Sequence, residues 1–167
     1  KRTLPWRINQ KSRKNQYYRI LSEFMLQQTQ VKTVIPFFNN FVKEIPDLKT
    51  LSKSNEKKVL KLWEGLGYYN RAKNLHKTSK ILIKKYQGRI PDNIVKLKEL
   101  PGIGDYTANI LLALIYNRPR IALDGNVKRV LSRIFNIYPT ESFNLFETTR
   151  NADLAEALME FGALVCK

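Results

Sequence analysis

Residues 100–108 read Leu100-Pro101-Gly102-Ile103-Gly104-Asp105-Tyr106-Thr107-Ala108, and this stretch decides the fold. Apolar residues at helical spacing precede and follow it, so the stretch indicates a helix, a tight glycine hairpin and the start of a second helix. Pro101 and Gly102 predict the end of the first helix, and we expect Gly104 to take a backbone angle that a side chain would resist. Such a hairpin turns backbone N–H groups toward one point at a helix N-terminus, where a phosphate can bind.

Helical periodicity extends over the rest of the chain, and the alternation typical of β-strands is scarce. We therefore expect an all-α fold. Pro36 is expected to kink or divide the helix in which it lies. The apolar faces of the expected helices start at Ile20, Val31, Val59, Leu75, Ile94, Ile110, Val127 and Leu154.

The charge of the chain favours a polyanionic partner. Its 167 residues carry 30 Lys and Arg against 14 Asp and Glu, a net charge of +16. Abundant Asn, Ile and Lys leave open that lysine enrichment reflects genome composition. However, no acid precedes Glu23, and the tail from Tyr138 onward is net acidic. An uneven basic surface is what a nucleic-acid-binding protein needs.

The same composition excludes other classes. The longest wholly apolar run, residues 110–116, is too short to span a bilayer, and the first twenty residues have no signal core. One cysteine excludes an internal disulfide and fits a reducing compartment. We expect a cytoplasmic protein, associated with the nucleoid if bacterial, and a fragment of a longer chain because it lacks an initiator Met and stops at Lys167.

Two isolated carboxylates are candidates for chemistry. Glu23 lies in an apolar neighbourhood, where burial disfavours the charged form and leaves a proton to donate near neutral pH. It could equally be a solvated glutamate on a helix face. Asp124 lies in Leu123-Asp124-Gly125-Asn126-Val127-Lys128-Arg129 and could cap the helix that starts at Gly125 or Asn126. Capping and chemistry are compatible, because a capping aspartate stays ionised.

A proton-bearing acid with an ionised carboxylate can break a glycosidic bond through an oxocarbenium-like transition state. If the leaving group is a nucleobase, the base must first leave the duplex stack. Gln27 and the pair Tyr68-Tyr69 are candidates for wedges that enter the stack, although adjacent tyrosines are more often core and rim residues.

The chain resembles the helix-hairpin-helix base-excision DNA glycosylases, and within them the adenine DNA glycosylases of the MutY type. The ordered blocks that carry the resemblance span nearly the whole chain. They are Leu4-Pro5-Trp6-Arg7, residues 22–31, Gly65-Leu66-Gly67-Tyr68-Tyr69 with Arg71-Ala72, Asn74-Leu75-His76, the hairpin and residues 123–129. The resemblance implies a two-module fold with the active-site cleft between the modules. We place the modules at residues 15–118, a six-helix module with the helix-hairpin-helix at about 93–117, and at residues 1–14 plus 119–167.

The resemblance also implies a role for each matching residue. Glu23 matches the general acid that protonates N7 of the extruded adenine and later helps activate water. Asp124 matches the carboxylate that stabilises the sugar cation or bonds to it transiently, and Asn126 its polar support. Tyr106 stands where bifunctional relatives carry a Schiff-base lysine, which predicts a monofunctional glycosylase.

Further matches concern the substrate. The adenine pocket is implied to comprise Trp6, Arg7, Leu26 and Glu156. The DNA-binding residues are implied to be Gln27, Gln28, Thr29, Tyr68, Gly102, Gly104, Thr107 and Lys128, with a monovalent cation possible at the hairpin. The implied partner is double-stranded DNA containing adenine opposite 8-oxoguanine or guanine. We expect the protein to bind it as a monomer, and we expect no membrane partner.

One departure from the family pattern concerns a metal cluster. The family carries four cysteines for a [4Fe–4S] cluster, and Cys166 looks like the first of them. Since the other ligands are absent, we expect no cluster to form in this chain.

Two alternatives stay open at this stage. One is a pyrimidine-directed glycosylase for mismatched or oxidised bases, against which Glu23 argues. The other is a non-catalytic helix-hairpin-helix DNA-binding module, which would need neither carboxylate.

Overall fold

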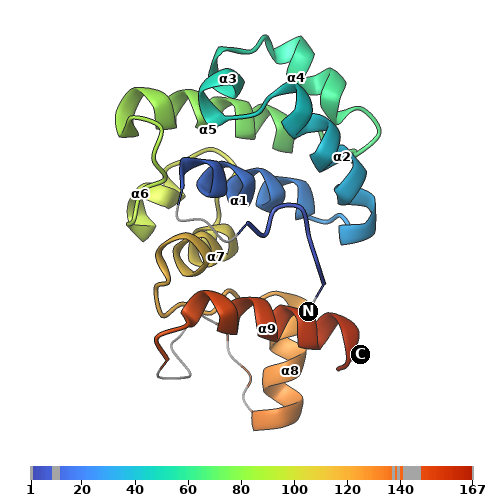
Figure 1. Ribbon diagram of the computed structural model, residues 1–167. Helices are drawn as coiled ribbons and strands as arrows, with labels where there is room; N and C mark the ends of the chain where they lie inside the picture. The colour runs from blue at the N-terminus through green and yellow to red at the C-terminus, as the bar shows by residue number, and fades with distance from the viewer. Residues whose placement is uncertain (1, 9–11, 137, 139, 141–147, 167) are drawn as a thin grey trace. The chain divides into compact units, whose positions relative to one another are not determined.

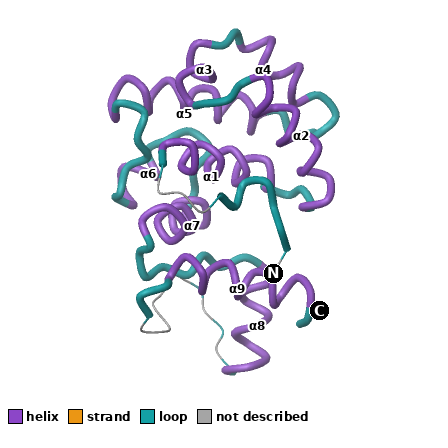
Figure 2. Tube along the Cα trace, viewed as in Figure 1, coloured by secondary structure: helices purple, strands orange, loops and turns teal. Residues whose placement is uncertain are grey.

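The computed structural model describes residues 2–8, 12–136, 138, 140 and 148–166. Within those residues it contains helices and loops but no β-strand (Figures 1 and 2), which confirms the all-α prediction. The helices are α1 Arg13–Leu26, α2 Val31–Glu44, α3 Leu48–Lys53, α4 Glu56–Trp63, α5 Asn70–Tyr86, α6 Ile94–Lys98, α7 Asp105–Tyr116, α8 Gly125–Phe135 and α9 Asn151–Leu164. In the part of the chain so described, none of these helices is long and apolar enough to cross a membrane.

The contacts divide the chain into two compact units. The N-terminal unit comprises Thr3–Pro91 and Glu99–Gly102, with α1 to α5, and the C-terminal unit comprises Lys1–Arg2, Asp92–Lys98 and Ile103–Lys167, with α6 to α9. The modules expected from the sequence, 15–118 and 1–14 with 119–167, assign α6 and α7 differently, and they stay a prediction.

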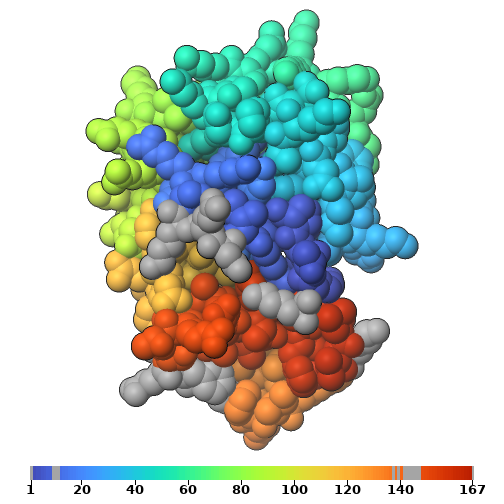
Figure 3. Space-filling model, in the orientation of Figure 1, coloured from blue at the N-terminus to red at the C-terminus, as the bar shows by residue number. Residues whose placement is uncertain are grey.

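In the N-terminal unit, α5 packs against α1, α3 and α4, and α2 packs against α1 and α4. In Figure 3, residues of α1, α2 and α4 are seen on the face of this unit that is in view. Ser12 caps α1, because its hydroxyl accepts a hydrogen bond from the backbone N–H of Asn15 at 3.2 Å. The core includes the fully buried Ile20 and Phe24 of α1 and an edge-to-face contact of Phe41 with Trp63.

Pro36 lies inside α2, which runs unbroken from Val31 to Glu44, so the proline does not divide the helix. A proline leaves the carbonyl four residues earlier, here that of Lys32, without its helical donor. Both Pro36 and Lys32 are exposed, so water can satisfy this carbonyl.

In the C-terminal unit, α9 packs against both α7 and α8. The contact with α7 buries Ile110, Ala113 and Ala155, and the contact with α8 buries Val127, Leu131 and Leu158. Gly162 of α9 permits the close approach of α8: a Cβ added there would lie 2.7 Å from the backbone oxygen of Asn126. The two helices therefore fix the start of α8, where Asp124 lies.

Candidate active site and DNA interface

The hairpin between α6 and α7 depends on Gly102. Its φ is +81°, in the left-handed region, and an added Cβ would lie 2.7 Å from Cε1 of Phe24 and 2.9 Å from Cβ of Asn74. The prediction that Gly104 takes the demanding backbone angle is wrong. Gly104 is the N-cap of α7 with φ −92° and ψ −171°, and a Cβ there would meet nothing within 4 Å. The chain reverses at Gly102 because only a glycine fits between α1 and α5.

Gly104 begins α7, whose first backbone N–H groups have no partner within the helix. Its carbonyl accepts from the N–H of Ala108 at 2.9 Å. Thr107 lies in the first turn and is buried. The N–H groups at this end give the helix N-terminus the capacity to bind an anion, as the hairpin motif predicts.

Glu23 lies near the C-terminus of α1 and is 7% exposed. It follows the fully buried Leu21 and precedes the fully buried Phe24. The alternative of a solvated glutamate on the helix face is therefore wrong. Burial removes most of the water from a carboxyl group, which is one of the conditions that a proton-donating acid needs.

The C-terminus of α1 and the loop before α5 carry the candidate wedge residues. Gln28 and Tyr68 both have left-handed backbone angles, φ +56° and +50°. Tyr68 and Tyr69 are 62% and 44% exposed, so they are surface residues rather than core. The Gln27 amide donates to the carbonyl of Gly102 at 3.2 Å. A depression of about 630 Å³ lies here, lined by Gln27, Gln28, Tyr68, Tyr69, Asn70 and Arg71.

Thr29, a predicted DNA-binding residue, closes the turn after α1. Its backbone N–H donates to Leu26 at 3.2 Å and its hydroxyl to Gln27 at 3.3 Å. Thr29 therefore shapes the turn on which the two glutamines lie.

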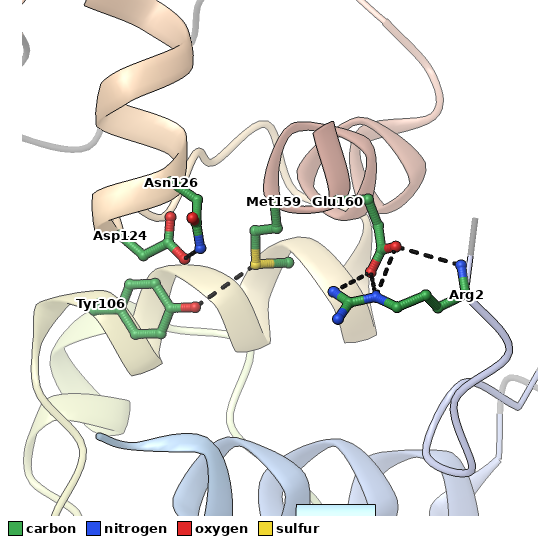
Figure 4. A network of polar contacts seen from close by, with 6 residues as sticks. All are labelled: Arg2, Tyr106, Asp124, Asn126, Met159 and Glu160. Carbon is green, nitrogen blue, oxygen red and sulfur yellow. Dashed lines mark hydrogen bonds and ion pairs between the residues drawn. The ribbon is translucent and has the colours of Figure 1, made fainter. Parts of the chain in front are cut away.

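Asp124 is the N-cap of α8, as the sequence predicts (Figure 4). One carboxylate oxygen accepts from the backbone N–H of Val127 at 2.7 Å, and the other accepts from the side-chain amide of Asn126 at 3.2 Å. Asn126 in turn accepts from Nη2 of Arg129 at 3.0 Å. Arg129 also donates to the carbonyls of Gly162 and Cys166, at 2.6 and 2.7 Å. The end of α9 thus orients the carboxylate through two side chains.

Tyr106 and Lys128 line a second cavity, of about 500 Å³, within the C-terminal unit. The Tyr106 hydroxyl donates to the sulfur of Met159 at 3.7 Å (Figure 4). The charged residues of the lining are Lys98, Asp105, Arg120 and Lys128, with Lys98 and Asp105 paired at 2.6 Å. The excess of positive charge suits a phosphate-bearing ligand.

The predicted adenine-pocket residues divide between the two units. Trp6 is 3% exposed and meets Phe38 edge to face, with ring centroids 5.2 Å apart. Leu26 is the last residue of α1, and Arg7 donates its backbone N–H to Leu4 at 3.0 Å. Glu156, buried at 3% exposure, belongs to α9 of the other unit. Likewise Glu23 belongs to the N-terminal unit and Asp124 to the C-terminal unit.

Cys166 follows α9, and its sulfur accepts from Nη1 of Arg133 at 3.7 Å. It is the single cysteine of the sequence, so the residues of this chain do not supply the four thiolates of a [4Fe–4S] site. In the described residues, no group of three or more His, Cys, Asp or Glu is placed to hold a metal ion.

Two arginines in this region were not singled out from the sequence. Arg71 of α5 is buried, and its guanidinium contacts the C-terminus of α1. Arg129 links Asn126 to α9. Each lies inside a motif that carries the resemblance, but each also donates to carbonyls 33 to 47 residues away along the chain, so no local pattern reveals these contacts.

The sequence model described as HhH-GPD superfamily base excision DNA repair protein matches residues 21–152. An adenine DNA glycosylase of Buchnera aphidicola subsp. Baizongia pistaciae is 43% identical over 99% of the chain and 49% of the relative. One of Rattus norvegicus is 37% identical over 99% of the chain and 36% of the relative. The chain therefore spans half or less of the length of these relatives.

Among solved structures, a thermostable thymine-DNA glycosylase superposes with a TM-score of 0.80 at 25% identity, covering 99% of this chain and 80% of the other. An endonuclease III–DNA complex superposes with a TM-score of 0.78 at 22% identity, covering 90% and 74%. These likenesses agree with the all-helical arrangement.

Proposed function

Because the chain belongs to the HhH-GPD superfamily of base excision DNA repair proteins, we propose that it hydrolyses the N-glycosidic bond of adenine mispaired with 8-oxoguanine or guanine. The substrate is double-stranded DNA. The observation that carries the proposal is the burial of Glu23 in a chain whose relatives are named adenine DNA glycosylases.

In the proposed reaction, Glu23 transfers its proton to N7 of the extruded adenine. The bond between N9 and C1′ then breaks, and its electron pair leaves with the base. The carboxylate of Asp124, oriented by Asn126, stabilises the cationic sugar. Water adds to C1′ and gives up one proton to the carboxylate of Glu23, which restores the acid. The products are free adenine and an abasic site.

Tyr106 supplies a phenol where lyase activity needs an amine, so the enzyme is monofunctional. The hairpin residues Gly102, Gly104 and Thr107, with Lys128, hold the phosphate backbone, and a monovalent cation can join them. Gln27 and Tyr68 enter the stack in place of the extruded base, and Gln28 and Thr29 contact the DNA beside them. The adenine is enclosed by Trp6, Arg7, Leu26 and Glu156.

The net charge of +16 supports DNA as the partner and implies that binding weakens as salt rises. We expect a monomer that acts in the cytoplasm and is associated with the nucleoid if the source is bacterial. The [4Fe–4S] cluster of the family needs three thiolates in addition to that of Cys166. We therefore expect no cluster to form on these 167 residues.

The test is a single-turnover assay on duplexes with adenine opposite 8-oxoguanine. Glu23→Gln should abolish base release while the affinity for the duplex stays within about threefold. Glu44→Gln is the matched control, because Glu44 is exposed and pairs only at the surface with Lys58 at 3.5 Å. Base release by Glu23→Gln at the wild-type rate would contradict the proposed acid.

The similarity to a thymine-DNA glycosylase favours one second candidate, thymine opposite guanine. A duplex with that mispair in the same assay distinguishes the two substrates. Binding of either duplex without release of any base would instead support a non-catalytic module.

A further inference from the structure

Arg71 joins the two segments that carry the candidate wedge residues. It lies in the first turn of α5, and only 7% of it is exposed. Its Nη1 donates to carbonyls at the C-terminus of α1, and its Nη2 donates to carbonyls of the loop before α5. The acceptors are Phe24 at 3.2 Å, Met25 at 2.7 Å and Gln27 for Nη1, and Leu66 at 3.4 Å and Gly67 at 3.1 Å for Nη2.

The guanidinium also lies between two aromatic rings. Its central carbon is 5.5 Å from the ring centroid of Trp63 and 5.3 Å from that of Tyr68. The indole of Trp63 is fully buried and is itself held by a 3.1 Å hydrogen bond to the carbonyl of Gly67. Tyr68 is largely exposed, so the buried cation forms a fixed support for an exposed ring.

The acceptors at the end of α1 suit a cation. The last carbonyls of a helix have no partner within it and carry the negative end of its dipole. Arg71 reaches these carbonyls with Nη1 and those of the loop with Nη2, and a lysine ammonium lacks the planar fork that divides donors between two segments. Its removal would release both the end of α1 at Gln27 and the loop at Tyr68.

We propose that Arg71 is a positioning residue that holds Tyr68 and Gln27 in the conformations from which they enter the DNA stack. The proposal rests on the proposed function in one point, that these two side chains are the wedge. Pre-organisation of this kind acts on extrusion of the base, because a wedge already fixed loses less entropy on insertion.

The experiment follows base extrusion directly. The target adenine is replaced by 2-aminopurine opposite guanine, and the rise in fluorescence at saturating protein reports unstacking. The variants are Arg71→Lys, Tyr68→Ala and the double variant. We expect Arg71→Lys to lower the equilibrium of extrusion about tenfold, which corresponds to about 1.4 kcal/mol. In the Tyr68→Ala background the same change should have less than about a threefold effect, since residues in contact are not additive.

A matched control distinguishes a specific effect on base extrusion from a general loss of stability. Tyr17→Phe removes a 2.7 Å hydrogen bond from the Tyr17 hydroxyl to the carbonyl of Ile45, which is buried in the same unit. All variants are compared at a temperature well below the lowest melting temperature. Tyr17→Phe should leave extrusion at the wild-type level.

Equal effects of Arg71→Lys with and without Tyr68 would overturn the proposal, and so would a wild-type protein that does not unstack 2-aminopurine. Adenine release is measured in parallel. Extrusion that depends on Arg71 and Tyr68 together, without release of any base, would refute the proposed hydrolysis and leave the positioning role intact.

Discussion

Substitution of Gly102 by alanine should destabilise the protein far more than substitution of Gly104. Two costs in folding free energy contribute to the effect of Gly102→Ala. A side chain at φ +81° costs about 1–2 kcal/mol, and the contacts with Phe24 and Asn74 at 2.7 and 2.9 Å add about 1–3 kcal/mol of overpacking. The sum, about 2–5 kcal/mol, corresponds to a fall in melting temperature of roughly 5–20 °C for a domain of this size.

Gly104→Ala has neither cost, because its backbone is extended and no atom lies within 4 Å of the added Cβ. The remaining cost is that of alanine at an N-cap, below about 1 kcal/mol relative to glycine. Thermal unfolding followed by far-ultraviolet circular dichroism measures both variants. Combining Gly102→Ala with Phe24→Leu should cost less than the sum of the two, because the leucine removes the atom in closest contact. Equal melting temperatures for the Gly102 and Gly104 variants would refute this reasoning.

The other predictions concern the C-terminal unit and the single histidine. Asn126→Ala should slow single-turnover base release about tenfold or more with little change in DNA affinity, because a hydrogen bond to a charged group contributes about 1.5–3 kcal/mol; an unchanged rate would mean that Asp124 is oriented without it. Gly162→Ala should lower thermal stability by about 1–3 kcal/mol through collision with Asn126, whereas Gly125→Ala, with no atom within 4 Å, serves as the harmless comparison. Burial, and secondarily the charge of Lys80, lowers the pKa of His76 below its ordinary 6.5. The unfolded chain therefore binds the proton first, so stability should fall as pH drops through about 6.5 and level off below the folded pKa. Urea titrations of the wild type and His76→Gln at several pH values check this, and equal pH dependence of the two would contradict it.

Much of the fold was predictable because it depends on long amphipathic helices. The apolar spacing around Ile20 and Phe24 predicts α1, and that around Leu154 and Leu158 predicts α9. Helix α3 was not predictable from apolar spacing, because its six residues are too few to show helical periodicity. Its N-cap is a residue type that favours helix starts: Asp47 accepts a hydrogen bond from the backbone N–H of Thr50 at 2.7 Å.

The hairpin shows why some local predictions fail. The sequence alone does not distinguish Gly102 from Gly104, because either glycine could have taken the left-handed backbone angle. The choice is made by Phe24 and Asn74, which lie on other helices and press against Gly102 alone. Arg71 was missed for a similar reason. A single basic residue in a helical pattern usually points to solvent, and only the folded chain shows carbonyls from two segments around it.

Glu23 and Asp124 differ in what each contributes to the folded state. Asp124 secures the first turn of α8, so a lineage that no longer repaired DNA would still be selected to retain it. Asparagine could replace it as a cap while abolishing its charge. The carboxyl at position 23 caps no helix, and its burial takes it out of water at a cost in free energy. Loss of the proposed hydrolysis would therefore remove the reason to keep a carboxyl at position 23, but not the reason to keep a helix cap at position 124.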